Sequence, residues 1–77
     1  MDKKQIVLDT IAEVGGIDAA ELKPETELVA QLGLDSAKAV QLLVLLEERL
    51  SIEIEDEQVP KLITVGDVLN AVDRVLA

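Results

Sequence analysis

Three stretches of this 77-residue chain carry apolar residues at the three- and four-residue spacing of an α-helix. They cover about residues 3–14, 35–50 and 64–76. A helix with one apolar stripe must bury that stripe against another element. A chain of this length holds one core at most, so we expect a single domain over residues 1–77. The pattern predicts a small all-α helix bundle.

The first predicted helix ends at a pair of glycines. Val7, Ile11 and Val14 share one of its faces, and Gly15 and Gly16 form a stop because glycine tolerates the left-handed conformation that ends helices. A long segment without regular periodicity follows, residues 17–34. Such loops are uncommon in small domains unless they are functional or pinned. Five apolar side chains could pin it to the core: Ile17, Leu22, Leu28, Leu32 and Leu34.

The second predicted helix starts at Asp35, whose carboxylate can accept hydrogen bonds from the free N–H groups there. This helix runs to about Leu50. A short helical turn is expected upstream of it, over residues 25–31. Its predicted core stripe consists of Ala39, Leu43, Leu46 and Leu50. Its opposite face holds Ala37, Gln41, Val44, Leu45 and Glu48. That face is more apolar than a solvated one needs to be.

Acidic residues dominate residues 47–57, where Arg49 is the one base. Ile52 and Ile54 alternate with polar residues, and we interpret this part as an extended linker with both isoleucines turned inward. The acids lack the glycine turn and ligand spacing of a calcium-binding loop, so a solvated acidic surface is the simpler interpretation.

A short third helix is expected after Asp56, and Pro60 limits its length. The last helix opens with Thr64 and Asp67, which predict a capping box with Asp in place of the usual Glu. Its apolar stripe consists of Val65, Val68, Leu69, Val72, Val75 and Leu76.

Composition excludes several functions. The chain has no cysteine, histidine, phenylalanine, tyrosine or tryptophan. Disulfides, thiolate metal sites, histidine-activated nucleophiles and stacking platforms are therefore absent, and we expect no catalytic or metal-binding residue. The net charge of −9 argues against nucleic acid and anionic membranes and favours basic partners. No apolar run approaches a membrane span and no signal segment is evident, so a cytoplasmic location is expected.

Ser36 is the residue that stands out chemically. It follows Gly33, Leu34 and Asp35 at the start of the second helix. A phosphate on its hydroxyl would be stabilised by free N–H groups and the helix dipole. An Asp-Ser pair is also an ordinary helix start. A self-contained serine hydrolase is disfavoured because the chain has no histidine to act as the base.

The chain resembles the acyl carrier proteins along essentially its whole length. The resemblance rests on residues 24–28, 32–36 and 47–50, with further likeness at residues 54–57 and 63–68. It implies a four-helix bundle with a long first loop and a short third helix. It also implies that Ser36 carries 4′-phosphopantetheine, added from coenzyme A by a magnesium-dependent phosphopantetheinyl transferase. The thiol of that arm would hold an acyl group as a thioester, and separate enzymes would supply the catalysis.

The resemblance also suggests two sets of binding residues on a chain expected to be monomeric. Candidates to line an acyl pocket are Val40, Leu46, Ile54, Val59, Leu62 and Val68, although each could be ordinary core packing. Candidates to dock acyl-loading and acyl-transfer enzymes with basic patches are Asp35, Ala37, Lys38, Gln41, Val44, Leu45, Glu47 and Glu48.

Near Ser36 the sequence departs from the pattern of fatty-acid-synthesis carriers. Ala37 replaces a usual leucine, and Lys38, Gln41 and, upstream, Gln31 replace common acids. These changes predict weaker charge steering and a specialised pathway, with neutral surface drift as the alternative. A peptidyl or D-alanyl carrier is the second candidate within the family. A cofactor-free acidic protein-binding module is the candidate from another class.

Overall fold

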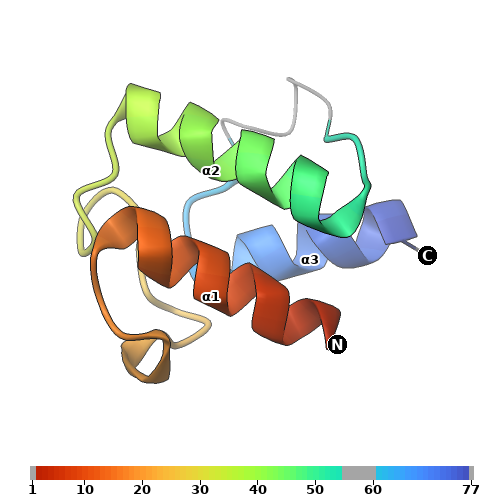
Figure 1. The fold of residues 1–77 in the computed structure, drawn as a ribbon. Coiled ribbons are helices and arrows are strands. Elements are labelled where there is room, and N and C mark those ends of the chain that lie inside the picture. The colour runs from red at the N-terminus through yellow and green to blue at the C-terminus, as the bar shows by residue number, and fades with distance from the viewer. Residues whose placement is uncertain (1, 55–60, 77) are drawn as a thin grey trace.

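The computed structural model describes residues 2–54 and 61–76 of the chain. This part contains three α-helices, α1 (Lys3–Gly15), α2 (Ser36–Leu50) and α3 (Val65–Leu76), with a 3-10 turn, η1 (Ala19–Glu21). α1 and α2 lie side by side and run in roughly opposite directions (Figure 1). The predicted all-α class is confirmed. The short third helix expected after Asp56 lies outside the described residues.

The helix ends follow from local capping. The Asp2 carboxylate accepts a hydrogen bond from the Lys4 N–H at the start of α1. Gly16 ends α1 in the left-handed conformation, with φ of 71°. Before α3, Thr64 Oγ1 accepts from Asp67 N and the Asp67 carboxylate accepts from Thr64 N, so the predicted capping box is confirmed.

The core is built from all three helices and from the first loop. Its buried members are Val7, Ile11, Leu28, Leu34, Leu42, Leu46, Val65, Val68 and Val72. The buried face of α2 is rotated about the helix axis relative to the predicted one. Leu42 and Leu46 are buried, whereas Ala39, Leu43 and Leu50 are only partly buried. The last turn of α3 also differs from prediction, because Val75 and Leu76 are exposed.

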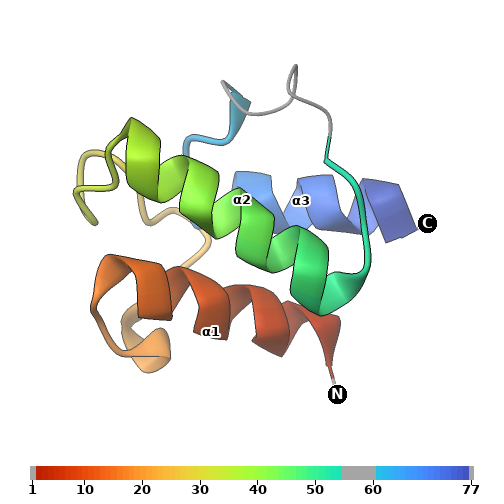
Figure 2. The ribbon, with the colours of Figure 1, turned by 45° about the horizontal axis from the view of Figure 1, so that its top comes forward.

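The first loop is tied to the chain that leads into α3. Glu27 and Thr64 form an antiparallel bridge, and Leu28 N donates to Ile63 O over 2.9 Å. Leu28 and Leu34 are buried, as predicted, while Leu22 and Leu32 pack against the core from partly buried positions. Residues 25–31, where a short helical turn is expected, do not form a regular helix. They contain only isolated turn hydrogen bonds. The first loop therefore lies against the chain that leads into α3 (Figure 2).

The chain after α2 turns back onto the core, as expected. Ser51 takes the left-handed conformation, with φ of 53°. Ile52 is partly buried and Ile54 is buried, so the prediction that both turn inward is confirmed. The Glu47 carboxylate accepts a hydrogen bond from Ile54 N over 2.9 Å, which holds this return segment against α2.

Candidate functional site

Ser36 is exposed and is the first residue of α2. Gly33, with φ of 67°, provides the turn before the helix. The Asp35 carboxylate then caps the helix by accepting from Lys38 N over 2.9 Å. The N–H groups of Ser36 and Ala37 lie in the first turn, so no intrahelical carbonyl can accept from them. An oxyanion on Ser36 Oγ would therefore meet free donors and the positive end of the helix dipole.

A groove of about 350 Å³ opens beside the Ser36 side chain. We call it the Ser36 groove, and it is lined by Glu27, Val29, Ala30, Leu34, Asp35, Ser36, Ala39, Leu62 and Ile63. Most of these residues are apolar. The groove is thus suited to an elongated group that begins at the serine hydroxyl and has little charge beyond its first atoms.

A smaller cavity of about 40 Å³ lies deeper, against the core side of α2. This core cavity is lined by Leu28, Val29, Leu34, Ala39, Leu42, Leu43, Leu46, Leu62 and Val68. Four residues line both spaces, namely Val29, Leu34, Ala39 and Leu62. The two spaces are therefore neighbours, and the wholly apolar lining of the cavity favours a hydrocarbon occupant.

Only some of the predicted pocket residues line the core cavity. Leu46, Leu62 and Val68 line the core cavity. Val40 is 57% exposed and does not line it, because its side chain points outward from α2. Ile54 is buried but lies outside the lining, and Val59 falls outside the described residues.

The sequence prediction missed Leu42, which is buried and lines the cavity. Its signal was available, because Leu42 precedes Leu46 by four residues and so shares its helix face. The loop residues Leu28 and Leu34 were expected in the core but were not predicted to line a pocket.

The predicted docking residues are mostly solvent-facing. Asp35, Ala37, Lys38, Gln41, Val44 and Glu48 are exposed, and Leu45 and Glu47 are half-buried. Glu47 is already engaged, because its carboxylate accepts from Ile54 N. A stabilising role inside the molecule is therefore assigned to Glu47 whether or not it also contacts a partner.

The site offers an exposed hydroxyl for attachment. The whole sequence contains no histidine or cysteine, so no imidazole or thiolate can activate Ser36 Oγ. Within residues 2–54 and 61–76, no three acidic side chains gather where they could hold a metal ion. Of the acidic run weighed for calcium, Glu55, Asp56 and Glu57 lie outside that part. None of the described helices is both long and apolar enough to span a bilayer.

The fold and the site define a small all-α carrier domain, with an exposed serine at a helix start beside an apolar groove and cavity. Comparison with known proteins gives the family. Residues 5–72 match the family described as "Phosphopantetheine attachment site". The chain is 48% identical over 63 residues to the acyl carrier protein of Helicobacter pylori strain J99, covering 82% of this chain and 81% of that protein. It is 47% identical over 64 residues to the acyl carrier protein of Clostridium acetobutylicum, covering 83% of each.

The chain therefore belongs to the acyl carrier protein family. Its prosthetic group is 4′-phosphopantetheine, which supplies a thiol that holds acyl groups as thioesters. Members of this family are carriers and not enzymes, and they interact with a phosphopantetheinyl transferase and with acyl-processing enzymes. The exposed hydroxyl, the free N–H donors and the apolar groove at Ser36 fit such a group.

Proposed function

We propose that Ser36 Oγ is the attachment point of the 4′-phosphopantetheine arm in a single carrier domain formed by residues 1–77. The observation that carries this proposal is the position of Ser36. Its hydroxyl is exposed at the first residue of α2 and opens on the groove that adjoins the core cavity. Two free N–H groups of the first turn stabilise the phosphate charge, and the groove gives the arm a surface along which to lie.

The core cavity is the proposed site for the acyl chain. Leu46, Leu62 and Val68 line this cavity. Ala39 lines both the cavity and the Ser36 groove. A hydrocarbon placed there leaves water for an apolar environment. The cavity of about 40 Å³ holds only a small group, so longer chains require the surrounding side chains to move apart.

Partner enzymes are proposed to carry basic charge that responds to the carrier's net charge of −9. Glu48 is exposed near the end of α2 and is the clearest acidic contact for such a partner. Near Ser36 the exposed residues Lys38 and Gln41 supply no negative charge. Fatty-acid-synthesis carriers commonly have acids at these two positions. Their replacement here supports a carrier of a specialised acyl pathway over one that serves only the general fatty-acid enzymes.

The attachment is tested by incubating the purified apo protein with coenzyme A, magnesium and a broad-specificity phosphopantetheinyl transferase. Intact mass spectrometry should show the gain of one 4′-phosphopantetheine group in the wild type and none in Ser36→Ala. The chain contains one other serine, Ser51, so Ser51→Gly is the matched control and should be modified fully. No gain in the wild type, or an equal gain in Ser36→Ala, would contradict the proposal.

A further inference from the structure

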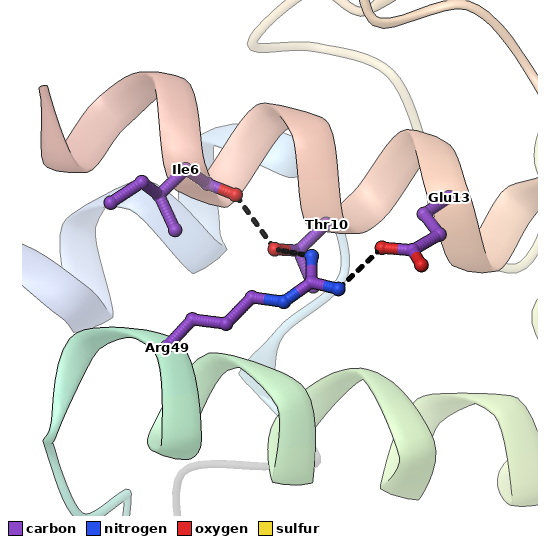
Figure 3. A network of polar contacts seen from close by, with 4 residues as sticks. All are labelled: Ile6, Thr10, Glu13 and Arg49. Carbon is purple, nitrogen blue, oxygen red and sulfur yellow. Dashed lines mark hydrogen bonds and ion pairs between the residues drawn. The ribbon is translucent and has the colours of Figure 1, made fainter. Parts of the chain in front are cut away.

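The last turn of α2 is fixed to α1 by polar contacts of Arg49 (Figure 3). One terminal nitrogen of Arg49 donates to Thr10 Oγ1 over 3.0 Å, and the other lies 2.7 Å from the Glu13 carboxylate. Thr10 is fully buried, so the first of these contacts reaches into the interior of the molecule. A hydrogen bond from a charged donor is stronger than one between neutral groups. The end of α2 is therefore held at a defined position on α1.

The earlier part of α2 is not held in this way. Among the described residues, no hydrogen bond or ion pair joins residues 36–46 to another element of the fold. The Ser36 groove also lies beside this part of the helix, so less of the chain packs against it there. Because α2 has polar contacts to its surroundings only near its end, its start is displaced more easily than its end.

The fixed end of α2 carries a wall of the core cavity. Leu46 lines the cavity but not the Ser36 groove, and it is fully buried, so it belongs to the closed side of the cavity. Arg49 follows Leu46 by three residues, which makes the two side chains neighbours on the helix surface. A movement of the last turns of α2 away from α1 would carry Leu46 with it. The extent of the cavity on this side thus depends on the contacts of Arg49.

We propose that Arg49 is a positioning residue for the acyl chain: its contacts with Thr10 and Glu13 hold Leu46 in place and limit the length of chain that the core cavity encloses. The inference rests on the proposed acyl site in that cavity. A cavity of about 40 Å³ has room for roughly three groups of the size of a water molecule. The residues shared with the Ser36 groove would contact the carbons nearest the thioester. A chain of about six carbons therefore fills the space, and a longer one must displace Leu46 against the Arg49 contacts.

The measurement is the rise in melting temperature when the holo protein is loaded with a butyryl, hexanoyl, octanoyl or decanoyl group. Each variant is compared with its own unacylated holo form, and the rise in the wild type should be largest with hexanoyl. Arg49→Met removes both polar contacts and keeps a long unbranched side chain, so the largest rise should move to octanoyl or decanoyl. Arg74→Met is the matched control, because it removes the same charge at an exposed position in the last turn of α3. It should keep hexanoyl as the best chain.

Two further variants separate positioning from general stability. Thr10→Val removes the same contact from the side of α1, and it should also shift the largest rise toward a longer chain, including where Arg49→Met does not fold. Arg49→Lys keeps a charged donor and should restore hexanoyl as the best chain.

A purely stabilising role of Arg49 predicts a different result. Arg49→Met would then lower the melting temperature of the holo form and of every acylated form alike, with hexanoyl still giving the largest rise, and this outcome would overturn the inference. A wild type whose melting temperature rises with no acyl group would contradict the acyl site itself, and the inference with it. A wild type that cannot be converted to the holo form would instead contradict the attachment at Ser36.

Discussion

Arg49 of α2 donates a hydrogen bond to the hydroxyl of Thr10 of α1 over 3.0 Å. Its other terminal nitrogen lies 2.7 Å from the Glu13 carboxylate, also on α1 (Figure 3). Thr10 is fully buried and donates in turn to the Ile6 carbonyl over 2.7 Å. The contact between the two helices thus includes a polar network. Every buried polar side-chain atom of the described residues, those of this network included, has a hydrogen-bond partner.

Thr10→Val should lower the free energy of unfolding by about 1–2 kcal/mol, because it keeps the shape of the side chain and removes two hydrogen bonds, one of them to a charged group. Glu13→Gln should cost at most about 0.5 kcal/mol, since the ion pair it weakens is exposed to solvent. Urea denaturation of the two variants gives both numbers. A larger loss in Glu13→Gln than in Thr10→Val would show that the ion pair, and not the hydroxyl, holds the helices together.

Gly66 is predicted to tolerate a side chain poorly because of its close approach to Pro24. Its N–H donates to the Pro24 carbonyl over 2.8 Å, and a Cβ added to it would lie 3.0 Å from that same oxygen. Gly66→Ala should lower the free energy of unfolding by about 1–3 kcal/mol through overpacking. The control is Gly15→Ala, where the nearest atoms of Leu32 would lie at 3.8 Å. Alanine there should be neutral or stabilising, because it favours the helix. Equal thermal stability of the two variants would be incompatible with a tight Pro24–Gly66 contact.

Asp67 should make a pH-dependent contribution to stability. The backbone N–H of Thr64, and then that of Ile63, lower the pKa of its carboxyl from 3.8 by donating hydrogen bonds to the charged form. Because the folded pKa lies below the unfolded one, this contribution is present above pH 3.8 and is lost as the pH falls through the folded pKa. The melting-temperature difference between wild type and Asp67→Asn should therefore be largest near neutral pH and shrink below about pH 4.

The control for Asp67 is Asp73→Asn, on the same helix, because no hydrogen bond to the Asp73 carboxylate is found within residues 2–54 and 61–76. Comparing each variant with wild type at the same pH removes the general effect of protonating the other acids. A wild-type advantage over Asp67→Asn that stays constant down to about pH 2.5 would rule out a role for the ionised carboxylate.

Repulsion among the acids gives a fourth prediction. With 16 acids and 7 bases, the folded chain holds like charges close together. Millimolar magnesium should raise the melting temperature because a divalent ion screens and neutralises carboxylates more effectively than sodium does. Sodium chloride at equal ionic strength is the control and should give a smaller rise. A melting temperature that stays flat across the magnesium titration would mean that self-repulsion is unimportant.

Local rules predicted much of the fold from the sequence. The glycine stop of α1, the Asp35 cap and the Thr64–Asp67 capping box depend on residues within a few positions of one another, and all three are present. The buried face of α2 could not be predicted in the same way. Residues 42–46 are all apolar, so the periodicity identifies a helix without deciding which of its sides is buried.

Contacts between distant parts of the chain left no periodic signal. The pairing of Glu27 with Thr64 joins residues far apart in sequence, and it fixes the loop that helps to line both the Ser36 groove and the core cavity. The Arg49–Thr10 contact was equally hidden, because nothing in either helix alone requires it. Ser36 could be selected from the sequence because its neighbours carry a local motif. The cavity beside it depends on packing that the motif does not encode.

The residues shared by the Ser36 groove and the core cavity give the last prediction. Ala39 lines both spaces, so a larger side chain there should close the way in. An acyl chain bound in the cavity stabilises the folded state, and a hexanoyl-loaded wild type should melt at a higher temperature than the unacylated holo form. Ala39→Leu should lose most of that gain. Ala37→Leu adds the same side chain at an exposed position of α2 and should keep the gain. Equal gains in the two variants would mean that the acyl chain stays outside the cavity or enters by another route.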